Sequence, residues 1–188
     1  MKRQKKFIIA FGGNANSDLG SPKETILFAR KALVSAGVIF LRESRPFRTP
    51  AFPAGAGPDF VNSAALIRAN HSPEDMLALL HQIEAESGRV REERWGARTL
   101  DIDLIAQDQT ILPNKARYRY WQTLDLQQQQ VETPTELILP HPRLQDRAFV
   151  LIPLMDIVPD WVHPVSGQTV AEMVANLPKS EREEVIAL

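Results

Sequence analysis

The sequence predicts an α+β protein with a ferredoxin-like βαββαβ core, an antiparallel sheet with both helices on one face, and a C-terminal helical extension. Short apolar runs typical of strands alternate with two longer segments of helical periodicity. Their order is strand, helix, strand, strand, helix, strand, which is that of the split βαβ arrangement. Helices in this order pack on one face of the sheet, so we expect the opposite face to be free for loops and ligands.

Four segments are predicted as strands, because each combines β-branched or aromatic side chains in a short run bounded by turn-forming residues. They are residues 7–11, 38–47, 60–68 and 99–106. Between the second and the third, residues 49–59 are rich in proline and glycine and hold little apolar surface. We therefore expect a long shaped loop there.

Two helices are predicted from matching start and stop signals. Ser21, followed by a proline and by Glu24 three positions on, has the pattern of a capping box, and Ser72 is a second capped start. Gly37 and Gly88 are the expected stops. The predicted stripes consist of Ile26, Ala29 and Leu33 in the first helix, and of Leu77, Leu80 and Glu84 in the second.

Residues 112–136 are predicted as a surface insertion, since two tyrosines, a tryptophan and four successive glutamines do not continue the core pattern. It could pack against the catalytic face, form a dimer contact or be solvated. After it, a short apolar helix closes at residues 156–159, and residues 169–177 are predicted as a last helix. We predict one domain over residues 1–188, with the insertion at about 112–136.

Composition excludes several classes of function. The 188 residues are 44% hydrophobic and 24% charged, which is typical of one globular domain. A net charge of −1 argues against a general nucleic-acid surface. The absence of cysteine excludes disulfides, thiolate metal sites and a cysteine nucleophile, and fits a cytoplasmic location. The apolar run after the basic start is too short for a signal peptide or a membrane span, so no membrane partner is expected.

Asp101 and Asp103 are the strongest chemical signal. Alternate residues of a strand share a face, so their Cα atoms lie about 6–7 Å apart on one side of the sheet. Such a pair is more often a solvated face, but this one interrupts an apolar strand, where unpaired carboxylates are costly. It suits one or two hard divalent cations. Four arginines within residues 89–98 suit phosphate oxygens, so we expect chemistry on a nucleoside triphosphate.

Seven motifs, taken in order, resemble one family, the 6-hydroxymethyl-7,8-dihydropterin pyrophosphokinases of folate biosynthesis. They are FGGN at 11–14, RTP at 48–50, DFVN at 59–62, IE at 83–84, GRVR at 88–91, RWGARTLDID at 94–103, and LPHPR at 139–143 with RAFV at 147–150. The resemblance spans residues 7–159 apart from the insertion. It implies the ferredoxin-like fold and transfer of the β,γ-pyrophosphoryl group of ATP to the pterin hydroxymethyl oxygen, leaving AMP.

The resemblance implies specific catalytic and nucleotide contacts. Asp101 and Asp103 would hold two Mg²⁺ ions between the triphosphate and the attacking hydroxyl. The arginines that match catalytic positions are Arg89, Arg91 and Arg98. The implied ATP contacts are His81, Glu84, Arg91, Arg98, His141 and Arg147. For His141 the competing interpretation is a Pro-His-Pro turn packed for shape.

The resemblance also implies a pterin site. Phe60 and Phe149 match positions that stack on the two faces of the ring, although either could be a core residue. Asn62 matches a position that recognises the ring edge with amide donors and an acceptor. The full set of implied pterin contacts is Gly12, Thr49, Phe52, Phe60, Asn62, Trp95 and Phe149. The substrates are then small molecules, and a monomer is favoured over a dimer.

This chain departs from the family pattern in three places. Its first turn, residues 12–20, is several residues longer than usual, and Gly13 stands where a serine is usual. His81 replaces a glutamine, and Gln82 lies on a different helical face. The insertion has no family role.

Two other classes stay open at this point. A nucleotidyl-transfer or cyclase palm domain also carries two metal-binding carboxylates on a βαββαβ sheet, but needs neither the loop at 49–59 nor the motifs from His141 to Phe149. A catalytically inactive binding module would not need the intact set of Asp101, Asp103, Arg98 and His141.

Overall fold

The computed structural model describes residues 4–51, 57–88, 98–125, 128 and 131–188. Its sheet consists of β1 (Lys5–Gly13), β2 (Ile39–Glu43), β3 (Phe47–Thr49), β4 (Phe60–Ala69), β5 (Asp101–Gln107) and β6 (Ile186–Ala187). The strand order is β5-β1-β4-β3-β6, β2 also pairs with β4, and every pairing is antiparallel. The neighbouring strands β5, β1, β4 and β3 therefore lie in the order expected of the predicted ferredoxin-like core.

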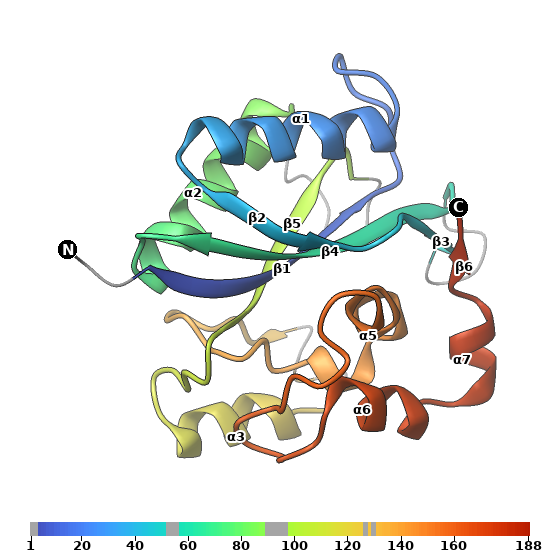
Figure 1. Ribbon diagram of the computed structural model, residues 1–188. Helices are drawn as coiled ribbons and strands as arrows, with labels where there is room; N and C mark the ends of the chain where they lie inside the picture. The colour runs from blue at the N-terminus through green and yellow to red at the C-terminus, as the bar shows by residue number, and fades with distance from the viewer. Residues whose placement is uncertain (1–3, 52–56, 89–97, 126–127, 129–130) are drawn as a thin grey trace.

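Two helices, α1 (Pro22–Ser35) and α2 (Pro73–Glu86), cover one face of this sheet, as predicted (Figure 1). Both begin with a capping box, at Ser21 and Ser72. Both are followed by a glycine in the left-handed region, Gly37 with φ +83° and Gly88 with φ +78°, which L side chains rarely adopt. The core beneath them joins β1, β4 and β5 to the helices, and includes Phe7, Ile9, Leu33, Leu80 and Ile102.

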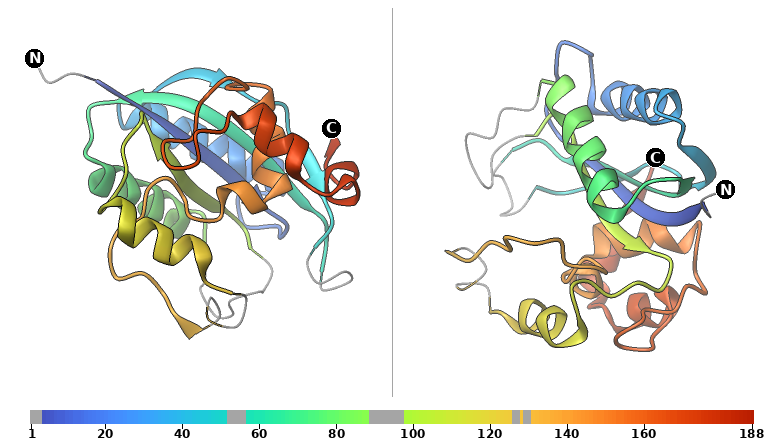
Figure 2. Two further views of the ribbon diagram at one scale, coloured as in Figure 1. Left: turned by 90° about the horizontal axis from the view of Figure 1, so that it is seen from below. Right: turned by 90° about the vertical axis from the view of Figure 1, so that its left-hand side faces the viewer.

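The opposite face is covered over most of its length, which corrects the expectation of a free face. Below the sheet lie α5 (Ala148–Met155) and α6 (Val170–Asn176), while α3 (Lys115–Thr123) and α7 (Lys179–Glu183) lie at the periphery (Figures 1 and 2). The physical reason is a second apolar cluster, in which Ile8, Ala10 and Ala64 of the sheet pack against Leu151 and Leu154 of α5. Within the described ranges no helix is both long and apolar enough to span a bilayer.

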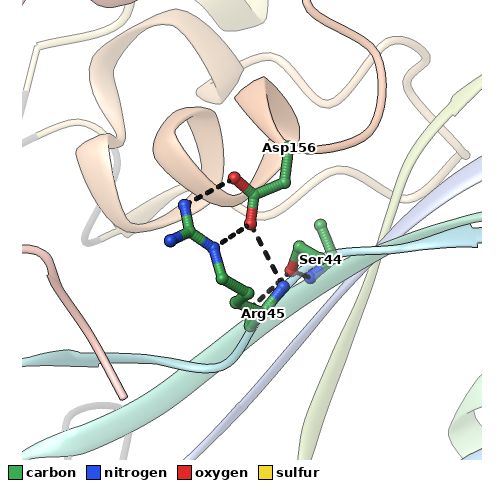
Figure 3. Close-up of polar contacts among 4 residues, drawn as sticks. Ser44, Arg45 and Asp156 are labelled. Carbon is green, nitrogen blue, oxygen red and sulfur yellow. Dashed lines mark hydrogen bonds and ion pairs between the residues drawn. The ribbon is translucent and has the colours of Figure 1, made fainter.

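The predicted strand over residues 38–47 is wrong as a single element, because the chain bends after Glu43 and continues as β3. At the bend, Ser44 hydrogen-bonds with Ala64 of β4, but the Arg45 amide donates to Asp156 Oδ2 (3.1 Å) and Pro46 has no amide hydrogen. The Arg45 guanidinium donates hydrogen bonds to both carboxylate oxygens of Asp156, from Nε (3.0 Å) and from a terminal nitrogen (2.9 Å), as Figure 3 shows. This contact ties the bend to the end of α5.

The insertion is closed at its base and packs on the C-terminal extension. Leu112 and Leu139 exchange backbone hydrogen bonds of 2.9 and 3.2 Å. Between them, Tyr118 of α3 is 0% exposed, and its hydroxyl lies 2.9 Å from His163 Nε2. Since His163 Nδ1 accepts from the amides of the following loop, Nε2 carries the hydrogen and donates to Tyr118. Burial lowers the pKa of His163 to about 4, so the ring stays neutral near pH 7.

Candidate active site

The two aspartates face the side of the sheet that α5 covers. Strand register pairs Gly12 with both Asp101 and Asn62, and pairs Ala10 with Asp103. Paired residues project to the same face, and Ala10 belongs to the cluster beneath α5. The aspartates and Asn62 therefore lie on that face, and only a Gly12 without a side chain separates Asp101 from Asn62.

Each aspartate has an arginine partner. Arg98 forms an ion pair with Asp101, and Arg147 Nη1 lies 3.2 Å from Asp103 Oδ2. All four side chains are a quarter to a third exposed. Each carboxylate is thus paired with an arginine, and the same negative charge could attract a metal cation. Within the described ranges no cluster of three or more acidic or histidine side chains could hold a metal ion. Two carboxylates on one face could contribute to a Mg²⁺ site, since Mg²⁺ keeps water and phosphate ligands.

The edge of β5 that pairs with no other described strand is held by hydrogen bonds with Glu84 and His141. Glu84 of α2 is 2% exposed, and its Oε1 accepts from the backbone amide of Ile102 at 2.7 Å. That amide stands between the two aspartates. Farther along, the His141 amide donates to the Ile105 carbonyl at 2.7 Å. The predicted contact of Glu84 with ATP stays a prediction, and the structure gives its carboxylate a positioning contact.

His141 is a neutral hydrogen-bond donor. Its Nδ1 accepts from the Arg143 amide at 3.1 Å, so the hydrogen lies on Nε2. Burial lowers the pKa of His141 well below its usual range, and the charges of Arg147 and Arg143 lower it further. The residue does stand in a turn, since its carbonyl accepts from the Leu144 amide. The turn leaves Nε2–H to donate to a phosphate or a hydroxyl.

The predicted pterin residues of β3, β4 and α5 come together at the same end of the sheet. Asn62 and Thr49 are both buried, and the Asn62 amide donates to Thr49 Oγ1 at 2.7 Å. A Cβ on Gly12 would lie 3.0 Å from Asn62 Oδ1, so glycine keeps this edge accessible. Phe60 is half-buried, and Phe149 is 40% exposed with the Arg147 guanidinium 5.6 Å from its ring centre. A core role does not fit Phe149.

Sequence reasoning assigned no role to Asn14, although it lies in the first motif. The residue is 6% exposed and joins three loops. Its Nδ2 donates to the Pro58 carbonyl (3.0 Å), its Oδ1 accepts from the Arg98 amide (2.8 Å), and its own amide donates to the Arg98 carbonyl (2.9 Å). Its partners are 44 and 84 residues away, so no local pattern could identify them. Asn14 fixes the backbone of the arginine that pairs with Asp101.

A groove of about 500 Å³ lies between α2 and the two ends of the insertion. Leu77 and His81 line it from α2, and Leu112 and Leu137 line it from the other side. Leu137, which lines the groove, lies four residues before His141 in the sequence. Glu74, Thr135 and Glu136 add polar groups to this lining, and the volume is sufficient for a heterocyclic base.

Comparison with known proteins decides the family. Residues 8–159 match the family model of 7,8-dihydro-6-hydroxymethylpterin-pyrophosphokinase. The chain belongs to this family. The match confirms the resemblance and rules out the palm-domain interpretation, and the reaction of this family makes the chain an enzyme rather than an inactive binding module.

Two relatives of this chain are also described as pyrophosphokinases of a hydroxymethyl pterin. A 2-amino-4-hydroxy-6-hydroxymethyldihydropteridine pyrophosphokinase of Synechocystis is 36% identical over 167 residues, which are 89% of this chain and 73% of the relative. The Pseudomonas aeruginosa protein of the same description is 35% identical over 170 residues, 86% of this chain and 88% of its own length.

Among solved structures, Plasmodium falciparum HPPK-DHPS with pterin and p-hydroxybenzoate is similar in fold, with a TM-score of 0.64 at 14% identity. The alignment covers 93% of this pyrophosphokinase but 44% of the Plasmodium chain.

Of the residues assigned by resemblance, Phe52, Arg89, Arg91 and Trp95 lie outside the described residues of this chain.

Proposed function

We propose that this end of the sheet transfers the pyrophosphoryl group of ATP to 6-hydroxymethyl-7,8-dihydropterin, as the family does in folate biosynthesis, and that Asp101 and Asp103 are its catalytic centre. One observation carries the assignment. Two arginine-paired aspartates lie on the same face of the sheet as Asn62, Asp101 is in register with Asn62 across Gly12, and the exposed Phe149 ring lies against Arg147, the partner of Asp103.

The reaction forms one bond and breaks another. The hydroxymethyl oxygen of the pterin attacks the β-phosphorus, and the bond from that phosphorus to the oxygen shared with the α-phosphate breaks. AMP leaves with that oxygen, and the hydroxyl proton passes to water. In such transfers, positioning and charge stabilisation supply most of the rate enhancement.

On this proposal the described side chains have distinct roles in binding metal and phosphate. Two Mg²⁺ ions, held by Asp101 and Asp103, would neutralise phosphate charge and lower the pKa of the attacking hydroxyl. Arg98 and Arg147 donate to phosphate oxygens. His141 donates from Nε2 to a phosphate oxygen or the ribose, which a neutral imidazole can do without a proton being gained first.

The pterin and the base occupy separate parts of the site. Phe60 and Phe149 stack on the pterin ring, and Asn62 and Thr49 hydrogen-bond its edge. The adenine base lies in the groove beside His81, and the triphosphate runs past His141 toward the aspartates. We also propose that the enzyme acts as a monomer in the cytoplasm, which light scattering and cell fractionation test directly.

The deciding experiment is a product assay. We expect AMP and pterin diphosphate in equal amounts, formed only when ATP, Mg²⁺ and the pterin are all present. Asp103→Asn serves as the control that strongly reduces this activity. Formation of ADP, or release of pyrophosphate from ATP, would contradict the proposed reaction.

A further inference from the structure

The 112–136 insertion, which the family motifs leave without a role, supplies one wall of the groove. Its two ends contribute Leu112, Pro113, Thr135 and Glu136, followed by Leu137. The backbone pairing of Leu112 with Leu139 holds the two ends together. Among these wall residues Glu136 is the one whose side chain carries a charge, and Glu74 lines the same groove from α2 as a second carboxylate.

Glu136 is held in place by α3. Arg117 donates from Nε to Glu136 Oε1 at 2.9 Å. The same guanidinium lies over the rings of Tyr120 and Trp121, at 5.3 and 5.8 Å from their centres, which restricts its orientation. Both partners of the ion pair are more than 40% exposed, so the pair adds little to stability. Its physical consequence is that the carboxylate has a defined direction.

We propose that Glu136 accepts a hydrogen bond from a ribose hydroxyl of the nucleotide, and so makes the insertion a selectivity element for ribonucleotides. The inference rests on the proposed function, which places the nucleoside in this groove. A carboxylate repels the triphosphate and cannot match the apolar faces of the base. The remaining donors of ATP are the ribose hydroxyls and the base amine.

The contact with Arg117 leaves one oxygen of Glu136 to accept from a nucleotide. Oε1 is engaged by Arg117, and no described residue hydrogen-bonds to Oε2. One oxygen can accept from either donor, and the ribose is the one assigned because carboxylate-to-ribose hydrogen bonds recur in nucleotide-binding sites. Arg117 then acts as a positioning residue, because it orients Glu136 without contact to the ligand.

The test compares ATP with 2′-deoxy-ATP and 3′-deoxy-ATP. Affinities of their Mg²⁺ complexes are measured by calorimetry and KM values in the AMP assay. For the unaltered protein we expect at least one deoxynucleotide to bind about tenfold more weakly than ATP, equivalent to about 1.4 kcal/mol. In Glu136→Ala this preference falls below about twofold, because the affinity for ATP falls and that for the deoxynucleotide does not.

Two variants separate positioning from general damage. Arg117→Ala should reduce the ribose preference while KM for the pterin stays unchanged. Glu132→Ala removes another carboxylate of the same insertion, one that accepts from the Tyr120 hydroxyl, and should keep the full preference. Glu136→Gln tests folding, because the shape of the side chain is retained.

The proposal is overturned if Glu136→Ala keeps the tenfold preference. It is also overturned if the variant loses discrimination between ATP and ITP instead, which would assign Glu136 to the base amine. Calorimetry needs no turnover, so a protein that forms no AMP would refute the proposed function and still decide the ribose contact.

Discussion

Replacing Asn14 with alanine should weaken both the fold and the reaction. The variant loses two side-chain hydrogen bonds, one to the Pro58 carbonyl and one from the Arg98 amide, at a position that is 6% exposed. Each such bond contributes about 0.5–1.5 kcal/mol net. We therefore expect a loss of about 2 kcal/mol, which lowers the Tm of a domain of this size by about 4–8 °C.

The kinetic effect should appear separately from the loss of stability. Asn14 fixes the backbone of Arg98, whose guanidinium pairs with Asp101, so its removal frees a proposed phosphate ligand to move. At 20 °C, where the variant stays folded, kcat should fall at least tenfold. Urea denaturation and the AMP assay measure the two effects separately.

A matched control lies in the same loop. Ser17→Ala removes contacts with Thr25 and Leu19 and leaves Arg98 untouched, so kcat should stay within twofold of the unaltered protein. The reasoning fails if Asn14→Ala keeps normal kcat, or if Ser17→Ala loses as much of it.

Three further predictions follow from the site and its support. Asp103→Asn should lower kcat more than about 100-fold, the scale of a lost charge-stabilising group, while the urea midpoint changes little; near-normal turnover at saturating Mg²⁺ would contradict the metal assignment. Phe149→Ala should weaken pterin binding about 3–10-fold, because a ring stack contributes about 0.5–1.5 kcal/mol, and calorimetry should show unchanged affinity for an ATP analogue; equal losses for both ligands would refute the stack. The hydrogen bond from Arg45 lowers the pKa of Asp156, so their pair stabilises the fold fully above the ordinary carboxyl pKa of about 4 and stops doing so as pH falls through the lowered value. Arg45→Ala should therefore be less stable than the unaltered protein at pH 7, with a difference that shrinks on acidification; a pH-independent difference in chemical denaturation would exclude this origin.

Elements with a local signature could be predicted from the sequence. The capping boxes at Ser21 and Ser72 fixed two helix starts, and alternation in β5 placed both aspartates on one face. The resemblance to a family supplied the proposed roles of His141 and Arg147, which stay predictions. These predictions depend on contacts a few residues apart or on motifs recognised as a set.

What could not be predicted depends on distant contacts. The bend between β2 and β3 is fixed by Asp156, which lies 111 residues from Arg45. The two-residue strand β6 is too short for a periodic pattern. The cluster beneath α5 draws on β1, β4 and β5 together, so the burial of that face required the assembled sheet.

On the proposed function, the two arginine–aspartate pairs should couple the binding of metal and nucleotide. A cation that binds Asp101 or Asp103 competes with Arg98 or Arg147 for the same carboxylate. Each displaced guanidinium becomes available to a phosphate oxygen, so the metal should raise affinity for the triphosphate. Linkage requires the triphosphate to raise affinity for the metal by the same factor. Free Mg²⁺ and free ATP should then each bind weakly alone, and the enzyme should respond to the concentration of their complex.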